Sequence, residues 1–479
     1  MGTYDLVVLG GGTAGLTAAI GAASQGARTL LVERDRTGGD CLWTGCVPSK
    51  ALLTVAERVS AVRTAGTFGV HAGAVTVDLA AAMAHVKQAI ATIAPHDSPE
   101  RLRSEGVEVV RGTGRFTAPD RIEVGGRTVR FARAMVATGA APLVPPIPGL
   151  REMEPLTSDT VWDLTELPRR LVVLGGGPIG AELGQAFARL GSQVTVVEMA
   201  DGLLPREEPA ARELVADALA ADGVDVRVRT RAVRVEQHAD TAQLVVECDG
   251  TEQAVPFDQV LAALGRRPVI DGLGLASAGV AVDHRGAVAV DGRLRTSNPR
   301  IYAGGDVTML LPFTHTASTH GATVVQNALF GLRRSVDHER IPWVTFTSPE
   351  VARVGLSVAE ARERFGDRAR VRTPSHAHLD RAVASGETDG FATLVGDPRG
   401  RIVGATVVGP RAGETIGEVV AWMAGGAKLS TIVRSPHAYP TWNEDLTAAS
   451  LEELRARLHR YRPITGALLR LRRVRTPWR

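Results

Sequence analysis

Residues 4–35 read YDLVVLGGGTAGLTAAIGAASQGARTLLVERD, and residues 171–201 repeat the pattern as LVVLGGGPIGAELGQAFARLGSQVTVVEMAD. Each stretch begins with an apolar run typical of a buried strand and continues through GGGxxG into an Ala-rich helical segment. Each then ends in a second apolar run that closes on Val-Glu. Two such units, 165 positions apart from Gly10 to Gly175, predict two dinucleotide-binding βαβ units in one chain.

The glycine spacing explains why these turns suit a phosphate group. In each unit the first glycine permits a tight turn, the second lets a pyrophosphate approach the backbone, and the third lets the helix pack on the strand. These positions are Gly10, Gly12 and Gly15 in the first unit and Gly175, Gly177 and Gly180 in the second. The phosphates then lie at a helix N-terminus, where free N–H groups and the helix dipole favour anions. The closing acids, Glu33 and Glu198, are placed to accept hydrogen bonds from ribose hydroxyls.

The composition is that of a soluble globular protein with several domains. The 479 residues are 44% hydrophobic and 22% charged, and only three are cysteines, which excludes a disulfide-stapled scaffold. No apolar run reaches the ~18–20 residues that span a bilayer. The N-terminus enters a strand without a secretion signal, so we expect a cytoplasmic protein. An aromatic fraction of 4% argues against base stacking and so against a nucleic-acid partner.

The charge is uneven along the chain. Residues 451–479 hold nine Arg and two Glu, although the whole chain has a net charge of only +3. A basic amphipathic tail can contact anionic lipid. We favour the simpler interpretation, a solvated or loosely docked C-terminal extension.

The third informative stretch is GGDCLWTGCVPSKAL, residues 38–52, which contains two of the cysteines. Pro48 opens a helical run, so Cys46 is expected near a helix N-terminus, a position that lowers the pKa of a thiol. A thiolate at Cys46 can donate electron density to an oxidised ring. Cys41, in the loop ahead, is better placed to meet a substrate disulfide. Cys248, before a DG turn at the end of an expected strand, is interpreted as a structural thiol.

The segment GGDCLWTGCVPSK resembles the redox loop of the class I pyridine nucleotide-disulfide oxidoreductases, which include dihydrolipoamide dehydrogenase, glutathione reductase and mercuric reductase. The resemblance covers residues 3–450 and includes further motifs in the family's order. These are GGGTAG with Glu33, ATGA with Gly139 and IYAGGD with Asp306 for FAD, GGGPIGAE for the nicotinamide nucleotide, LGRRP at 264–268, and TFTSPEVARVGLS at 345–357, where the dimerisation domain opens.

The resemblance implies an FAD-dependent NAD(P)H oxidoreductase that acts on a sulfur group, in a homodimer with its active site shared across the interface. By this resemblance Cys46 is the charge-transfer thiol against the flavin, and Cys41 is the interchange thiol of a redox disulfide. Lys50 and Glu182 correspond to an ion pair beside the flavin N5. Glu198 would repel the 2′-phosphate of NADPH, so we expect NADH, with NADPH less favoured.

The segment PHAYPTWNE, residues 436–444, departs from the family's His-Pro-Thr-x-x-Glu pattern. In the family this His and Glu come from the partner subunit, and the His is the acid–base group for the departing thiol. Here Glu444 stands at the family's spacing, but Tyr439 occupies the His position. An unperturbed Tyr titrates near ~10, against ~6.5 for His, so it is a poor general base at neutral pH. On a strand-like stretch His437 would share a face with Tyr439 and could replace the missing base.

Three functions remain open at this point. The leading one is an NADH:disulfide oxidoreductase that passes electrons through FAD and the Cys41–Cys46 disulfide to an acceptor. The second reduces a metal ion such as Hg(II), a quinone or another small oxidant; a Tyr at this position is similar to mercuric reductase, although no cysteine follows Cys248 to relay the metal. The third is a low-turnover redox sensor that binds FAD and NAD. No cluster of ligand residues indicates a resident metal.

The motifs predict an α/β protein with two Rossmann-type dinucleotide-binding domains and a C-terminal α+β dimerisation domain. Strands FATLVG and IVGATVVG are expected in the dimerisation domain. The predicted regions are 1–145 and 266–335 for FAD, 150–265 for the nicotinamide nucleotide, 340–450 for dimerisation, and 451–479 for the basic tail.

Overall fold

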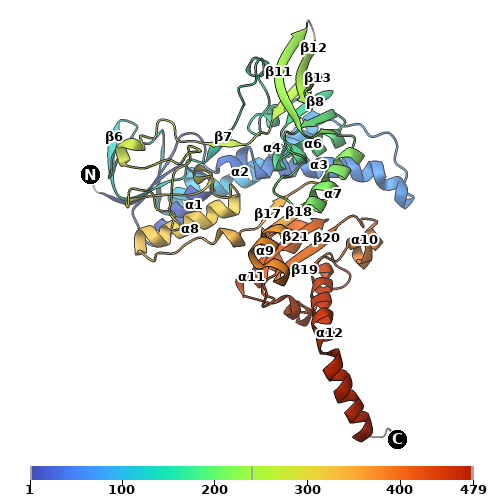
Figure 1. Ribbon diagram of the computed structural model, residues 1–479. Helices are drawn as coiled ribbons and strands as arrows, with labels where there is room; N and C mark the ends of the chain where they lie inside the picture. Colours follow the sequence, from blue (N-terminus) through green and yellow to red (C-terminus); the bar gives the residue numbers. More distant parts are fainter. Residues whose placement is uncertain (1–2, 239–240, 476–479) are drawn as a thin grey trace. The chain divides into compact units, whose positions relative to one another are not determined.

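A computed structural model describes residues 3–238 and 241–475 (Figure 1). The described chain divides into two compact units. The first takes in the residues up to 205 together with 219–338, and the second takes in 206–218 together with the residues from 339 onward.

The first unit contains a sheet built around the N-terminal strand. Its strands are β1 (Tyr4–Leu9), β2 (Thr29–Glu33), β3 (Val107–Arg111), β4 (Arg115–Ala118), β5 (Arg121–Val124), β6 (Arg127–Val136) and β16 (Ile301–Ala303). They run in the order β3-β2-β1-β6-β5-β4, with β16 also paired to β6. The pairs β1–β2, β1–β6 and β2–β3 are parallel, which suits the continuous apolar runs of strands covered on both faces.

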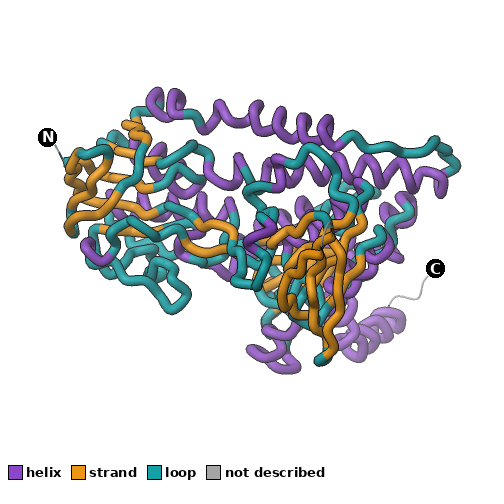
Figure 2. The backbone as a smooth tube through the Cα atoms, turned by 90° about the horizontal axis from the view of Figure 1, so that it is seen from above, coloured by secondary structure: helices purple, strands orange, loops and turns teal. Residues whose placement is uncertain are grey.

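The same unit contains the helices α1 (Thr13–Ser24), α2 (Gly39–Trp43), α3 (Cys46–Thr64), α4 (Leu79–Ile93), α5 (Pro99–Ser104) and α8 (Thr314–Phe330). Of these, α1, α5 and α8 pack against this sheet. Leu6 and Val8 of β1 form one buried core with Ala18 and Ala22 of α1, and α8 adds Val324 to it. The long helices α3 and α4 lie side by side (Figure 2).

A second parallel sheet in the first unit repeats the strand–helix–strand order. It consists of β8 (Arg170–Leu174), β9 (Gln193–Val197), β10 (Asp225–Arg227) and β14 (Gln259–Ala262), with α6 (Pro178–Leu190) between β8 and β9. The unit also holds the antiparallel strands β11 (Thr230–His238), β12 (Thr241–Cys248) and β13 (Thr251–Phe257), and the pair β7 (Ala140–Pro142) and β15 (Arg266–Pro268). Both repeats predicted from the sequence therefore form βαβ units.

The two βαβ turns have the same geometry. Gly10 has a φ of 105° and Gly175 a φ of 104°, a conformation that favours glycine. A Cβ on Gly15 would lie 1.9 Å from the carbonyl oxygen of Gly10, and a Cβ on Gly180 would lie 1.9 Å from that of Gly175. The fold itself thus requires the first and third glycine of each motif.

The second unit consists of an antiparallel sheet and helices, which is the α+β architecture predicted for this part of the chain. Its strands are β17 (Trp343–Thr345), β18 (Glu350–Gly355), β19 (Arg370–Arg372), β20 (Phe391–Gly396) and β21 (Ile402–Gly409), in the order β17-β18-β21-β20-β19. Its helices are α9 (Val358–Phe365), α10 (Asp380–Ser385), α11 (Ala412–Ala424) and α12 (Glu444–Arg475), with the first part of α7 (Pro209–Ala221). The strands predicted from FATLVG and IVGATVVG are β20 and β21.

Residues 206–218 differ from the predicted division, because they cluster with the second unit rather than with the nicotinamide-binding region. The Trp343 indole donates to Glu207 at 2.7 Å, and the Val358 backbone N–H donates to Glu208 at 2.7 Å. The boundaries of the other regions stay predictions.

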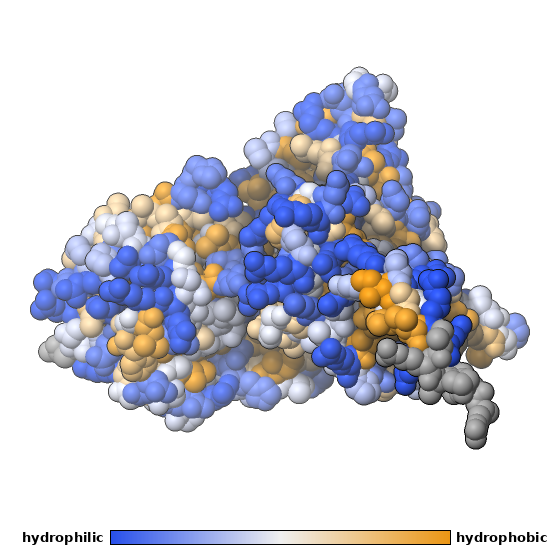
Figure 3. All heavy atoms as spheres, turned by 60° about the horizontal axis from the view of Figure 1, so that its bottom comes forward, coloured by the Kyte–Doolittle hydropathy of each residue, from blue (hydrophilic) through white to orange (hydrophobic). Residues whose placement is uncertain are grey.

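As far as Arg475, where the described residues end, the basic tail is part of α12. The helix buries Asp445, Leu446 and Glu453 in its first turns, and from Arg455 onward nearly all its described side chains are exposed. In Figure 1 this part extends away from the sheet of its own unit. Figure 3 shows hydrophobic and hydrophilic side chains close together near its described end. Among the described residues, no helix combines the length and hydropathy that crossing a bilayer requires.

Candidate active site

The cysteine pair lies where α2 is followed by α3. Cys46 is the first residue of α3, as the sequence predicts. Cys41 lies within the short helix α2, so its expected position in a loop is wrong. The chain turns tightly between the two helices because Gly45 packs on the preceding turn; a Cβ there would lie 2.8 Å from the carbonyl oxygen of Asp40. Both residues are free thiols in the structure.

The two thiols differ strongly in acidity. A hydrogen bond from Cys41 lowers the pKa of Cys46 to about 6, with further lowering by Thr314 and by the charge of Lys50. The same hydrogen bond, together with burial, raises the pKa of Cys41. At neutral pH the reduced pair therefore holds a thiolate at Cys46 and a thiol at Cys41. The direction for Cys46 is the predicted one, but the leading cause is the neighbouring thiol.

Thr314 is a site residue that the sequence analysis missed. It is the first residue of α8, and its Oγ1 lies 3.3 Å from the Sγ of Cys46. Its hydroxyl stabilises the thiolate by a hydrogen bond. No motif in the sequence analysis includes it, because it lies 268 positions from Cys46 along the chain.

Lys50 and Glu182 meet across α3 and α6. The Lys50 Nζ lies 2.8 Å from the Glu182 Oε2, and the two side chains are 36% and 7% exposed. The structure thus brings together two residues that the family resemblance paired. Their spacing in the sequence alone does not predict this pairing. A nearly buried carboxylate depends on such a partner, because a buried charge without one is strongly unfavourable.

The acids that close the βαβ units hold the glycine turns in place. Glu33 accepts the backbone N–H of Gly11 at 2.6 Å, and Glu198 accepts that of Gly176 at 2.6 Å. The other oxygen of each carboxylate accepts the backbone N–H two residues on, at 2.8 and 2.7 Å. Each carboxylate therefore lies directly beside its turn, with lone pairs left for a further donor.

The second glycine of each motif has no role in the fold that would require glycine. Gly12 and Gly177 have φ values of −81° and −72°, which any residue adopts. A Cβ on Gly177 would meet no atom within 4 Å, and one on Gly12 would meet only the Cα of Gly39, at 3.7 Å. Each glycine thus leaves a space at a helix N-terminus that a side chain would fill. This space fits a pyrophosphate.

Asp306 and Gly139 lie at the ends of strands in the same unit. Gly139 has a φ of 70° and precedes β7. Asp306 follows Gly305 at the end of β16; burial raises the pKa of its carboxyl, and the charge of Arg266 opposes that effect. Among the described residues the Asp306 carboxylate has no hydrogen-bond partner, so it can accept a donor from a ligand.

Arg266, from the LGRRP segment, forms hydrogen bonds with residues of three separate segments of the first unit. Its guanidinium donates to the carboxylate of Asp40 and to the carbonyl oxygen of Ala140, and it also donates to Ser158 at 3.3 Å. It therefore links β15 with β7 and with the helix that carries Cys41.

The segment 436–444 contains no strand, so the strand-like conformation expected for it is wrong. Pro436 and Pro440 lie on either side of residues 437–439 and cannot donate to a strand ladder. His437 is 7% exposed, and its ring nitrogens contact Glu418 at 2.8 Å and Thr447 at 3.0 Å. Both ring nitrogens are thus already in contact with neighbouring side chains. This arrangement does not support His437 as a replacement base.

Tyr439 is 70% exposed, and its hydroxyl donates to Asp380 at 2.7 Å. That hydrogen bond raises the pKa of Tyr439, so the phenol keeps its proton at neutral pH. Glu444 is the first residue of α12 and accepts the backbone N–H of Thr441 at 3.2 Å. Tyr439 is thus a hydrogen-bond donor here and not a base.

Two further observations concern residues outside this set. His376 and Asp445 form a contact of 3.1 Å in which each side chain is 1% exposed. Cys248 ends β12, and Asp249, with a φ of 50°, begins the predicted turn. Within residues 3–238 and 241–475, no group of three or more potential metal ligands is found.

Comparison with known proteins assigns the class. The model for pyridine nucleotide-disulphide oxidoreductases matches residues 4–321, and the model for the dimerisation domain of the same proteins matches 341–450. The chain therefore belongs to the pyridine nucleotide-disulphide oxidoreductase family, whose members use FAD and a pyridine nucleotide. This confirms the predicted family, fold class and oxidoreductase activity.

Individual relatives fall into different branches of the family. A mercuric reductase from Streptomyces lividans is 38% identical over 456 residues, or 93% of this chain and 95% of that protein. A dihydrolipoyl dehydrogenase from Thermus scotoductus is 38% identical over 464 residues, or 94% and 97%. The Cu(II) complex of the HOCl-induced flavoprotein disulfide reductase RclA from Escherichia coli aligns with a TM-score of 0.82 at 29% identity, covering 94% and 99%.

Proposed function

We propose that the protein is an NADH-dependent flavoprotein that reduces a disulfide substrate through Cys41 and Cys46. The observation that carries this proposal is the unequal thiol pair, with a thiolate at Cys46 and a thiol at Cys41 joined by a hydrogen bond. Two cysteines with only a structural role would not require that the pKa of one thiol be lowered to about 6.

The two βαβ units supply the cofactor sites in this proposal. The first binds FAD through the turn of Gly10, Gly12 and Gly15, with Glu33, Gly139 and Asp306 as further contacts. Bound FAD supplies two-electron transfer between a nicotinamide and a disulfide. The second unit binds NADH through Gly175, Gly177 and Gly180. Glu198, next to this turn, receives a ribose hydroxyl and repels a 2′-phosphate.

The sulfur chemistry follows from the acidity of the pair. In the reduced state Cys41 attacks one sulfur of the substrate disulfide and passes its proton to Cys46 along their hydrogen bond. The substrate S–S bond breaks as a mixed disulfide forms with Cys41. The first substrate sulfur leaves as a thiol after it takes the proton back from Cys46, which is then a thiolate again. Cys46 then attacks the sulfur of Cys41, which re-forms the Cys41–Cys46 disulfide and releases the second substrate thiol. Two electrons and one proton thus pass from the pair to the substrate, and the second substrate sulfur takes its proton from solvent.

Tyr439 limits which acceptors suit this step. In the homodimer we propose that Tyr439 of the partner subunit, with Glu444 of the partner subunit, lies at the departing thiol. A phenol that keeps its proton can donate a hydrogen bond but cannot take up a proton as His does. Disulfides whose leaving thiol is already acidic depend least on such help.

A second candidate acceptor is a soft metal ion, and Tyr439 in place of the family's His favours it. Thiolate ligands select soft metals. The relative from Streptomyces lividans is a mercuric reductase, and the RclA structure is a Cu(II) complex. A quinone or another small oxidant belongs to the same candidate class. We do not propose the low-turnover sensor, because each relative named above is a reductase or a dehydrogenase.

The test compares acceptors on the purified holoenzyme. NADH or NADPH oxidation is followed with lipoamide, an aromatic disulfide, Hg(II), Cu(II) and a quinone as acceptors, for the wild type and for Cys41→Ser. We expect NADH to be preferred, the aromatic disulfide to turn over, and Cys41→Ser to abolish that activity. Disulfide turnover that Cys41→Ser leaves intact would overturn the proposal. Turnover with a metal ion only would favour the second candidate.

A further inference from the structure

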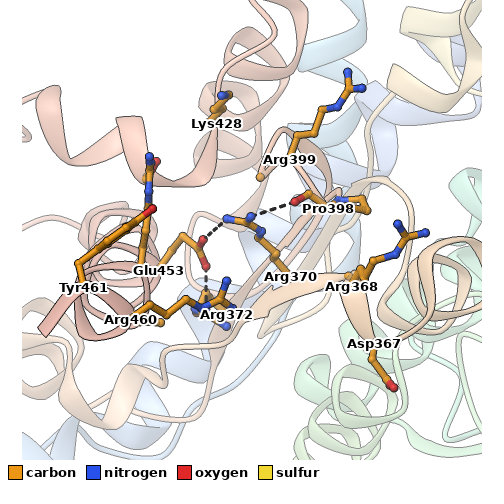
Figure 4. A pocket seen from close by; sticks show the side chains of 15 residues that line it. Asp367, Arg368, Arg370, Arg372, Pro398, Arg399, Lys428, Glu453, Arg460 and Tyr461 are labelled. Carbon is orange, nitrogen blue, oxygen red and sulfur yellow. Dashed lines mark hydrogen bonds and ion pairs between the residues drawn. The ribbon is translucent and has the colours of Figure 1, made fainter. Parts of the chain in front are cut away.

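The second unit contains a cavity of about 570 Å³ that the proposed redox chemistry does not use (Figure 4). Its walls come from β19, from the turn after β20, from the segment around Lys428 and from α12. Seven of the lining residues are Arg or Lys, and two are Asp or Glu. The cavity therefore has five more cationic than anionic side chains.

A buried carboxylate shapes the wall of the cavity. Glu453 on α12 is 4% exposed, and its oxygens lie 2.6 Å from Arg370 and 2.8 Å from Arg372. Arg370 also donates to the carbonyl oxygen of Pro398 at 2.9 Å. Figure 4 shows Glu453 between the two guanidinium groups. These contacts hold two cations in fixed positions, and one carboxylate cannot neutralise both.

The other cations of the cavity have no acidic partner. Among the described residues, no ion pair is formed by Arg368, Arg399, Lys428, Arg457 or Arg460. Elsewhere arginines do pair, as Arg189 does with Asp222 at 2.8 Å. Cationic side chains that lie close together without anionic partners repel one another, and a bound anion reduces that repulsion.

Part of this cavity lies outside the family's dimerisation domain. The match to that domain ends at residue 450, whereas Arg457, Arg460 and Tyr461 lie further along α12. The exposed tail thus completes a concave site with residues that the family model does not contain.

We propose that this cavity binds an anion that carries several phosphate groups. Guanidinium groups bind phosphate oxygens in a two-pronged geometry. A single phosphate group has a charge of about −1.5 to −2, which is less than this excess of cations. The volume lies in the range of about 300–1,000 Å³ that small-molecule sites occupy. Such phosphates occur on soluble molecules and on phosphorylated lipid headgroups.

The test uses the full-length holoenzyme and two probes. Sodium tripolyphosphate, followed by titration calorimetry, represents a soluble ligand. Phosphatidylcholine vesicles with and without a phosphoinositide, followed by co-sedimentation, represent a lipid headgroup. The test variant is Arg399→Gln/Arg457→Gln/Arg460→Gln, which leaves the Glu453 ion pairs intact. The matched control is Arg293→Gln/Arg362→Gln/Arg434→Gln, which removes the same charge from exposed positions outside the cavity.

We expect the wild type and the control to bind tripolyphosphate alike, and the test variant to bind at least about tenfold more weakly. Unchanged thermal unfolding of the variants checks their folding. Phosphoinositide binding without tripolyphosphate binding, lost in the test variant only, would support the site and assign it to a lipid headgroup. The proposal is overturned if neither probe binds, or if both triple variants lose binding equally.

Discussion

Thr314 Oγ1 lies 3.3 Å from the Sγ of Cys46, although 268 positions of chain separate the two residues. The first residue of α8 therefore contacts the first residue of α3. This hydroxyl is one of the groups that lower the pKa of Cys46, so the acidity of the redox loop depends partly on a residue outside the loop.

Thr314→Val should raise the pKa of Cys46. In the wild type the thiolate persists above about pH 6 and is lost as the pH falls through about 6. Without the hydroxyl this midpoint should rise by up to about one unit, because one pKa unit corresponds to about 1.4 kcal/mol. The measurement is a pH titration of the thiolate-to-flavin charge-transfer band in reduced holoenzyme. Thr319→Val, on the exposed face of the same helix, is the control and should leave the midpoint unchanged.

Lys50→Met and Glu182→Gln should move the pKa of Cys46 in opposite directions. The charge of Lys50 lowers this pKa, whereas the charge of Glu182 raises it. Lys50→Met should therefore raise the pH midpoint of iodoacetamide alkylation at Cys46, and Glu182→Gln should lower it. Mass spectrometry of the Cys46 peptide gives the rate at each pH. Shifts of the same sign would show that the pair acts through packing and not through charge.

Tyr439→His should improve turnover of ordinary disulfides. A His at this position titrates near ~6.5 and can act as acid and base, an effect that typically contributes ~10²–10⁴-fold. We expect at least about a tenfold gain in kcat/KM with lipoamide, with a new pH dependence between about 6 and 7. Tyr439→Phe serves as the control and should show no gain. A Tyr439→His variant with unchanged kcat/KM would refute the proposed role of this position.

Glu198→Gln should weaken the preference for NADH. The amide still accepts a backbone N–H from the Gly176 turn but no longer repels a 2′-phosphate. The ratio of kcat/KM for NADPH to that for NADH should rise by about tenfold. Glu33→Gln makes the same change in the first βαβ unit, where Glu33 accepts the N–H of Gly11. If both variants shift the ratio equally, the assignment of the second unit to NADH is wrong.

His320 should make the protein less stable in mild acid. Burial lowers the pKa of His320 to about 4, and its neutral Nδ1 accepts the backbone N–H of Gly305 at 3.1 Å. The unfolded chain binds a proton near pH ~6.5 and the folded chain only near 4, so stability is lost as the pH falls between these values. The loss should approach about 3 kcal/mol. Urea unfolding between pH 7 and 4.5 should show a shallower pH dependence for His320→Gln than for the wild type.

The local parts of the fold could be predicted from sequence because their signals are contiguous. The βαβ units follow from glycine spacing and apolar runs, and Cys46 at a helix start follows from the residues after it. Long-range contacts leave no such signal. Thr314 beside Cys46 and His376 beside Asp445 depend on how separate elements pack, and no local pattern contains that information.

The segment around Tyr439 shows where local reasoning failed. His437 would share a face with Tyr439 on a strand-like stretch, but the segment contains no strand, and Pro436 and Pro440 lack the backbone N–H donors that a ladder needs. The ring of His437 turns instead to Glu418 and Thr447. The pairing of Lys50 with Glu182 came from family resemblance, because residues 132 positions apart give no local indication of contact.

The anchoring of α12 has a practical consequence. Its first turns are held in the second unit by Leu446 and Glu453, while nearly all its described side chains from Arg455 onward are exposed. The outer part of this helix is therefore a suitable place to fuse a reporter domain or to immobilise the enzyme on an electrode. Such an attachment would leave the five-stranded sheet undisturbed.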